Sequence, residues 1–343
     1  MVIREILVEQ QSIAWLPWAV SYFFFIGLAF SAVFAGLWIR YNSKNNQHEF
    51  IAIMIALVCA IVAPVALMAD LHQPSRIANF YLHPTPWSWM AWGAVFLPLF
   101  TVSVVGYFLS LLRQTIPVQH IAPWLKVLYW GDFNLARWTT VFRFLSFLFS
   151  VLILLYTAME VFMVAARPLW HHYGLILLIL CSALPTALLI CQCAIQLVDR
   201  SFKLKSLTLI GLCNLFGFVA TILWLYFSND QAGAQLTQLW QLSILPKGLL
   251  GCWIALIVLF FLPNRFLINI VSVLVALVFT WLFRWILLIM VQGLPKYNAL
   301  VHFHTLTWKL DEAIGMLSMF SLCVFIGILC WQFFGGRLGG YNE

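Results

Sequence analysis

The chain has 343 residues, of which 64% are hydrophobic and only 8% are charged, and its formal net charge is +7. Its mean hydropathy of +0.98 lies far outside the range of soluble domains, so water is excluded as its main solvent. The positive charge does not indicate nucleic-acid binding, because Lys and Arg are spread over short segments between apolar runs. Runs that are apolar on all sides, such as residues 175–190, exclude an outer-membrane barrel of alternating strands.

Nine apolar runs follow one another along the chain, each close to the roughly 20 residues that a spanning helix needs. We expect helices at residues 17–39, 50–69, 87–112, 140–165, 174–198, 206–228, 244–262, 266–292 and 312–334. The segment 114–138 contains Pro and Trp residues typical of a helix at the membrane interface. The sequence therefore predicts an all-α integral membrane protein with about nine transmembrane helices. Residues 1–165 and 166–292 are expected to form two four-helix bundles, and residues 293–343 an outer loop, one extra C-terminal helix and a tail.

With nine spans, the connecting segments alternate between the two sides of the membrane. One side has eleven basic residues, which are Arg40, Lys44, Arg113, Lys126, Arg137, Arg143, Arg200, Lys203, Lys205, Arg265 and Arg337. The other side has six, which are Arg4, Arg76, Arg167, Lys247, Lys296 and Lys309. Because basic residues are enriched in cytoplasmic loops, this bias predicts a bacterial inner-membrane protein with a periplasmic N-terminus and a cytoplasmic C-terminus.

Histidine and cysteine positions bear on whether the chain binds haem or a metal. A membrane cytochrome b needs axial His ligands at haem depth on facing helices, but all eight His residues lie in loops or at helix ends. The eight Cys residues lie inside apolar segments, where thiols behave as small buried hydrophobic groups. The sequence therefore predicts no haem and no metal in this chain.

Charged side chains are costly at membrane depth, so each is a candidate functional residue. Glu160 lies near the outer end of the fourth expected helix, and Tyr156 precedes it by one turn on the same face. Asp70 ends the second expected helix on the same side of the membrane. Arg284, in the eighth expected helix, lies roughly 12 Å deeper and is expected within reach of Glu160. These four residues are our candidate catalytic groups, with a purely structural ion pair between Glu160 and Arg284 as the alternative.

The first expected helix adds Trp18 and Tyr22 on the same side, one turn apart. Aromatic residues at helix ends are also common interfacial anchors, which is the alternative interpretation of this pair. A carboxylate, a phenol and aromatic walls at one edge of the bilayer suit a lipid-soluble ligand that exchanges protons, above all a quinol. The phenol can hydrogen-bond a quinone oxygen, and the carboxylate can carry away protons as electrons leave.

Two sequence motifs resemble a known family. Residues 70–93 read DLHQPSRIANFYLHPTPWSWMAWG, and residues 156–170 read YTAMEVFMVAARPLW. The first resembles the acidic-Leu-Gly-x-Pro-x-Arg-Phe segment and the Pro-x-Ser-Trp-Met-x-Trp-Gly helix entry of the NrfD/PsrC family of quinol-interacting membrane subunits. The second is similar to that family's Tyr-Thr-Gly helix and Pro-x-Trp turn. Arg284 followed by Gln292 is a weaker third match.

The resemblance implies a haem-free membrane anchor that oxidises quinol, either menaquinol or ubiquinol, near the periplasmic face. It implies electron transfer to a periplasmic ferredoxin-like subunit with [4Fe–4S] clusters and on to a molybdopterin catalytic subunit. Such complexes are respiratory reductases for tetrathionate, thiosulfate or polysulfide, and the tetrathionate branch of the family looks most similar. By motif position, Tyr156 and Asp70 match family residues at the quinone, and His72 lies in the same loop motif. Trp18 and Tyr22 match by region only.

The sequence departs from the family motifs at two positions, and two alternative functions stay open. His72 replaces a glycine of the loop motif, and Ala158 replaces the glycine after Tyr-Thr, which puts the pocket shape in doubt. A secondary transporter is one alternative, because Pro64, Pro98 and Pro185 could break helices, although a polar midplane cluster is missing from the sequence. A purely structural anchor for an electron-transfer complex is the other.

Overall fold

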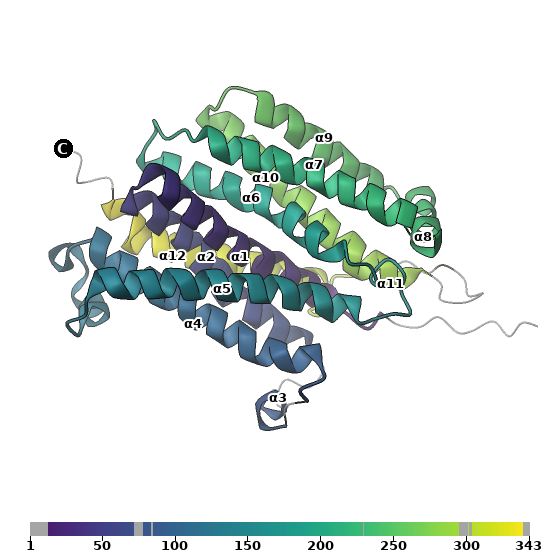
Figure 1. Ribbon diagram of the computed structural model, residues 1–343, viewed down its shortest axis with the longest axis horizontal. Coiled ribbons are helices and arrows are strands. Elements are labelled where there is room, and N and C mark those ends of the chain that lie inside the picture. The colour runs from purple at the N-terminus through teal and green to yellow at the C-terminus, as the bar shows by residue number, and fades with distance from the viewer. Residues whose placement is uncertain are drawn as a thin grey trace, which may run out of the picture.

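The computed structural model describes residues 13–71, 78–83, 85–228, 230–294, 301 and 304–338. Within these residues the regular structure is entirely helical, and the helices run side by side in two bundles (Figure 1). Eight helices are long and apolar enough to cross a membrane, or nine if one sharply bent pair counts as a single span. The predicted class, an all-α multi-pass membrane protein, is therefore confirmed.

The first bundle consists of α1 (Pro17–Ser43), α2 (Asn46–Asp70), α4 (Trp89–Thr115) and α5 (Leu135–Phe162). Each packs against the next, and α5 returns to contact α1, which closes the bundle. Asn45 and Asn134 accept hydrogen bonds from backbone N–H groups at the starts of α2 and α5, so each helix begins with a polar cap. The short helix α3 (Asn79–Leu82) precedes α4.

The connection between α4 and α5 differs from the single interfacial helix expected for residues 114–138. It contains two 3₁₀ helices, η2 (Val118–His120) and η3 (Pro123–Tyr129). Pro117 and Pro123 precede or begin these turns, and proline does not permit a continuous α-helix there. The Arg113 guanidinium donates hydrogen bonds to three carbonyl oxygens at the end of this connection, which fixes it against α4.

The second bundle consists of α6 (Leu175–Val198), α7 (Lys205–Ser228), α9 (Leu245–Phe261) and α10 (Phe266–Trp285). The last helix continues as a π-helical turn, η4 (Ile286–Met290), and as α11 (Val291–Gly293). The helix α8 (Asp230–Leu242) was not expected from the sequence and lies between α7 and α9. Residues 231–242 meet α9 at an angle of 92°, so the predicted span at 244–262 is the second arm of a bent pair.

The extra C-terminal helix is α12 (Ala313–Phe333), followed by η5 (Gly335–Arg337). It packs on α1 and α2 outside the two bundles. Phe320 contacts the rings of Phe24, Phe25 and Trp281, which ties α12 to α1 and α10. The predicted arrangement of two four-helix bundles and one added helix is therefore present.

Corresponding helices of the two bundles, taken in chain order, run in the same direction. In Figure 1, α3, α8 and α11 lie toward one end of the helix stack. We call this the α8 end; here α2, α5, α7 and α10 finish, and α4 and α9 begin. The polar residues predicted to form a site on α2 and α5 belong to this end.

Candidate functional site

A cluster of two carboxylates and two phenols lies inside the first bundle near its α8 end. Tyr156 and Glu160 stand one turn apart near the end of α5 and interact with each other. Tyr156 also interacts with Tyr22 of α1, and Glu160 is within electrostatic range of Asp70, the last residue of α2. Three helices thus bring together four of the seven residues that the sequence predicts for the site.

Two polar atoms of this cluster, Tyr22 Oη and Glu160 Oε2, form no hydrogen bond of normal geometry within the described residues, although both residues lie close to Tyr156. Tyr22 is only 1% exposed, and within the described residues its hydroxyl has no hydrogen bond of normal geometry. The same holds for Oε2 of Glu160. A buried polar atom without a partner costs about 1–3 kcal/mol, and such atoms usually face a water or a ligand. The cluster therefore has the capacity to hydrogen-bond a group that is not part of this chain.

A cavity of about 400 Å³ opens beside the cluster, between α2, α4 and α5. Tyr156 and Glu160 form its polar part, and the remaining walls are mostly apolar. Pro64 of α2 and Pro98 of α4 both line it, and each lies inside a helix that continues past it. A proline inside a helix removes one backbone hydrogen bond and favours a kink, which makes room between two packed helices.

Gly93 of α4 is a site residue whose role the sequence did not reveal. A Cβ atom placed on Gly93 would overlap the phenol ring and hydroxyl of Tyr156. The ring therefore lies directly against the α4 backbone, and only glycine permits this approach. Gly93 ends the Trp-Met-x-Trp-Gly motif of the sequence, and its contact with Tyr156 is a physical reason for the glycine there.

We expect Gly93→Ala to displace the Tyr156 phenol and to weaken binding of a quinone analogue at least as much as Tyr156→Phe does. Gly251→Ala is a matched control, because nothing lies within 4 Å of a Cβ at this other helical glycine. Titration of the purified protein with a fluorescent quinone analogue measures the effect. Unchanged affinity in Gly93→Ala would contradict the contact described here.

Arg284 forms no ion pair with Glu160 in the described residues, so the alternative of a structural ion pair is wrong, and the expected contact between the two candidate catalytic groups is not formed. The Arg284 guanidinium is fully buried and donates hydrogen bonds to the carbonyl oxygens of Phe23, at 3.3 Å, and Ile179, at 3.0 Å. It therefore links α10 to α1 and α6 at the junction of the bundles. Gly27 lies beside it, where an added Cβ would approach Nη2 to 3.1 Å. The helix that carries Arg284 was predicted correctly, but the side chain points toward the junction of the bundles rather than toward α5.

Two further predicted site residues, Trp18 and His72, have different outcomes. The indole of Trp18 lies against Gly315 of α12, where a Cβ would overlap it. Trp18 is not among the residues that line the cavity. His72 falls in residues 72–77, outside the described residues, so its predicted part in the site stays a prediction. No group of three or more His, Cys, Asp or Glu side chains among the described residues is arranged to hold a metal ion.

The second sequence motif ends in a turn that fastens the two bundles together. The Arg167 guanidinium donates to the carbonyl oxygens of Val291, Gln292 and Leu294, at the end of the last bundle helix. Burial lowers the pKa of Arg167 from its ordinary value. Trp170 donates from Nε1 to the Leu287 carbonyl in the π-helical turn, which leaves carbonyl groups without their usual helical partner.

Ala14 and Trp15, which precede α1, contact the same turn. The Trp15 ring stacks on Trp170 with ring centroids 5.1 Å apart. The Gln292 side chain accepts hydrogen bonds from the backbone N–H groups of Ala14 and Trp15, and it donates to the Trp15 carbonyl. The Arg-Pro-Leu-Trp motif and Gln292 are thus structural partners, and together they fix α1 beside α10 and α5 at the α8 end.

A second buried charge cluster lies at the opposite end of the first bundle. Glu49 is fully buried in the first turn of α2, and Arg143 of α5 binds its two oxygens at 2.6 and 2.8 Å. Arg40 approaches the same carboxylate to 3.6 Å, and Tyr107 donates its hydroxyl to it. Arg143 was counted among the basic residues on one side of the membrane, but it pairs inside the bundle, because Glu49 belongs to α2 and not to the preceding loop.

Comparison with known proteins agrees with this architecture. Residues 6–295, which include both bundles, match the model of the family described as "Polysulphide reductase, NrfD". The chain is 35% identical to a tetrathionate reductase subunit of Salmonella typhimurium (strain LT2) over 346 residues, or 98% of this chain and 96% of that relative. The latter match extends past the family model and includes α12. The resemblance identified in the sequence motifs is therefore confirmed, and the chain belongs to the NrfD family of membrane proteins.

Proposed function

We propose that this chain is the membrane subunit of a respiratory reductase complex, that it oxidises quinol in the cavity beside Tyr156 and Glu160, and that tetrathionate is the terminal substrate of the complex. The observation that carries the proposal is the apolar cavity of about 400 Å³ lined by Tyr156 and Glu160, where the buried Glu160 Oε2 forms no hydrogen bond of normal geometry within the described residues. Apolar walls suit the tail and ring of a quinol, and a few polar groups orient its hydroxyls.

Quinol oxidation releases two electrons and two protons, and the cluster supplies an acceptor for the protons. Glu160 accepts the first proton from a quinol hydroxyl, passes it to Asp70 and is then free to accept the second proton, while Tyr156 hydrogen-bonds a quinol oxygen and holds the ring in position. Asp70 is the last residue of α2 and lies within electrostatic range of Glu160, and we assign it the transfer of that proton to water. His72 is proposed to assist Asp70.

The electrons leave toward the membrane face at the α8 end. We propose a periplasmic subunit with [4Fe–4S] clusters as their acceptor and a molybdopterin subunit as the site of substrate reduction. The name of the Salmonella relative and the family match support a reductase complex. The excess of basic residues at the opposite end supports a periplasmic α8 end in a bacterial inner membrane.

The test uses the assembled complex with a soluble menaquinol or ubiquinol analogue as electron donor. Tyr156→Phe and Asp70→Asn are expected to leave the complex assembled and to slow quinol-dependent reduction of the partner at least tenfold. Tyr173→Phe, an exposed tyrosine outside the cluster, serves as the control.

Two results would contradict the proposal. Unchanged quinol turnover in both variants would leave a purely structural anchor, with quinone chemistry on another subunit. Solute uptake by the isolated chain in liposomes, without any quinol effect, would favour a secondary transporter.

A further inference from the structure

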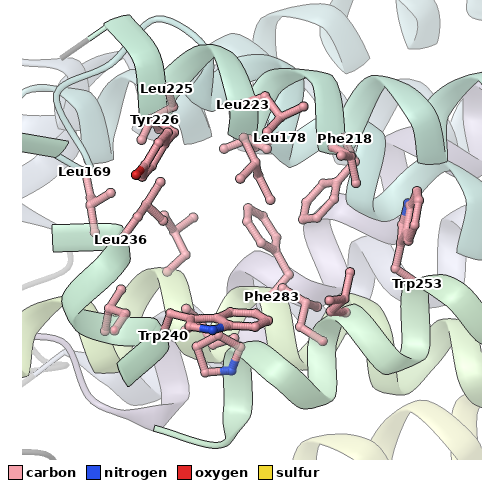
Figure 2. A pocket seen from close by; sticks show the side chains of 18 of the residues that line it. Leu169, Leu178, Phe218, Leu223, Leu225, Tyr226, Leu236, Trp240, Trp253 and Phe283 are labelled. Carbon is pink, nitrogen blue, oxygen red and sulfur yellow. The ribbon is translucent and has the colours of Figure 1, made fainter. Parts of the chain in front are cut away.

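The second bundle contains a cavity of about 500 Å³ that the proposed quinol chemistry does not use (Figure 2). It lies at the α8 end, between the last part of α7, the first part of α9 and the last part of α10. The first-bundle cavity lies between the last part of α2, the first part of α4 and the last part of α5. Each cavity thus lies between the second, third and fourth helices of its bundle, at the same end, and α8 adds a further wall to the second cavity.

The two cavities differ in chemistry. Where α5 presents Tyr156 and Glu160 one turn apart, α10 and its continuation η4 present Phe283 and Leu287, also four residues apart. No carboxylate or basic side chain is among the described residues that line the second cavity. Its few polar groups are partly engaged, because Thr237 donates to the Gly233 carbonyl and Trp253 donates to the Leu215 carbonyl. The cavity therefore offers an almost entirely apolar lining, and no carboxylate or imidazole among the described lining residues could accept a proton.

An apolar cavity of this size is a poor site for water, which needs several polar partners, and an empty one forfeits packing contacts along its whole wall. A hydrocarbon chain from the bilayer can make these packing contacts with the apolar side chains of the wall and needs no hydrogen bond. The side chains in Figure 2, including Leu223, Leu236 and Phe283, surround an open centre, and Trp240 lies along one wall. The occupant therefore has a flexible apolar chain.

The first turn of α9 indicates the head group. Pro246 and Leu249 line the cavity, and Lys247, between them in the sequence, is exposed. A lysine at the membrane edge attracts an anionic phosphate, and Trp240 and Tyr226 provide the amphipathic aromatic rings common at this depth. We propose that this cavity binds one acyl chain of an anionic phospholipid, whose phosphate lies at Lys247.

Such a lipid would fill the space between the bent pair α8 and α9 and the other helices of the second bundle. The bent pair α8 and α9 forms two walls of the cavity, and α7 and α10 form the others. Because α9 has only 17 residues, it is at the short limit for a spanning helix. An acyl chain between the bent pair and the rest of the bundle supplies the packing that side chains do not.

Native mass spectrometry of the intact complex, released from membranes in mild detergent and offered phosphatidylglycerol, phosphatidylethanolamine or menaquinone, tests the proposal. We expect one phosphatidylglycerol retained per chain. Val219→Trp places a large ring in the cavity and should abolish retention, whereas Val258→Trp, on the lipid-exposed side of α9, should not. Lys247→Gln keeps the packing intact and should reduce phosphatidylglycerol retention about fivefold, without changing that of phosphatidylethanolamine.

Three outcomes would overturn it. Equal retention in Val219→Trp and Val258→Trp would place the lipid elsewhere. Preference for phosphatidylethanolamine would remove the anionic head group. Retention of menaquinone that is lost in Val219→Trp would make the cavity a second quinone site instead. None of these results depends on electron transfer, so they are independent of the proposed function.

Discussion

Replacing Glu160 with Gln should slow quinol-dependent electron transfer by about 10²- to 10⁴-fold, the usual contribution of a positioned general base. Glutamine has the size of the carboxylate and can still hydrogen-bond Tyr156, but it cannot accept a proton from the quinol. Asp70 is the other carboxylate of the cluster, and it interacts with Glu160 from the end of α2. We therefore expect the double variant with Asp70→Asn to be slower than either single variant.

The measurement is the rate of partner reduction in the assembled complex at saturating quinol analogue. Binding of the analogue should change less than the rate, because Tyr156 and the apolar walls remain. Asp132→Asn is a suitable control, since this exposed carboxylate lies at the opposite end of the first bundle, just before α5. A Glu160→Gln complex with normal turnover would exclude Glu160 as the proton acceptor.

Arg143→Leu is expected to give the largest loss of stability, about 3–5 kcal/mol, because it leaves Glu49 buried with its main partner removed. The bidentate contact, at 2.6 and 2.8 Å, joins α2 to α5, and Arg40 at 3.6 Å is a weaker substitute. Thermal unfolding of the protein in detergent and the amount recovered from membranes are the measurements. Adding Glu49→Gln should restore more than half of the loss, since the uncompensated charge is then gone.

Arg137→Leu is the matched control, because Arg137 lies on the same helix but is exposed. We expect it to change stability by less than about 0.5 kcal/mol. Equal stability of Arg143→Leu and Arg137→Leu would show that the buried ion pair is not important for the fold. A double variant as unstable as Arg143→Leu alone would show that Arg143 acts by packing and not by charge.

The spanning helices could be predicted because the apolar runs are long and end at polar or proline-rich segments. Eight of the nine expected runs correspond to helices that pass the length and hydropathy requirements on their own. The exception is α9, whose partner α8 was missed. The sequence of α8 is rich in Gln and only weakly apolar, so it has no spanning signal, and its sharp angle to α9 depends on packing against α7.

The site was predicted in part, and the reasons differ from residue to residue. Tyr156 and Glu160 share a helix face, so their proximity follows from helical spacing alone. Asp70 could be added because helix ends on one side of a membrane lie at similar depth. The contact of Tyr22 with Tyr156 depends on the rotation of α1 about its axis, which periodicity could not fix when nearly the whole helix is buried.

The wrong or missed predictions concern contacts that depend on how helices pack and where they begin. The helix of Arg284 was predicted correctly, yet the direction of its side chain depends on how the two bundles pack, and it faces backbone carbonyls of α1 and α6. The predicted start of the second helix at residue 50 left Glu49 in a loop. A shift of a few residues in that boundary concealed the buried partner of Arg143. Gly93 carried a signal in its motif, but its contact with Tyr156 required the structure.

The most direct test of the central claim, that quinol binds between α2, α4 and α5, is photo-crosslinking with a quinone analogue that has a photoreactive group on its ring. Peptide mapping should place the label within residues 64–71, 90–102 or 156–160, and excess menaquinone should prevent it. The Tyr156→Phe variant should be labelled less. Labelling confined to residues 218–226 or 246–253 of the second cavity, or to a partner subunit, would contradict the account.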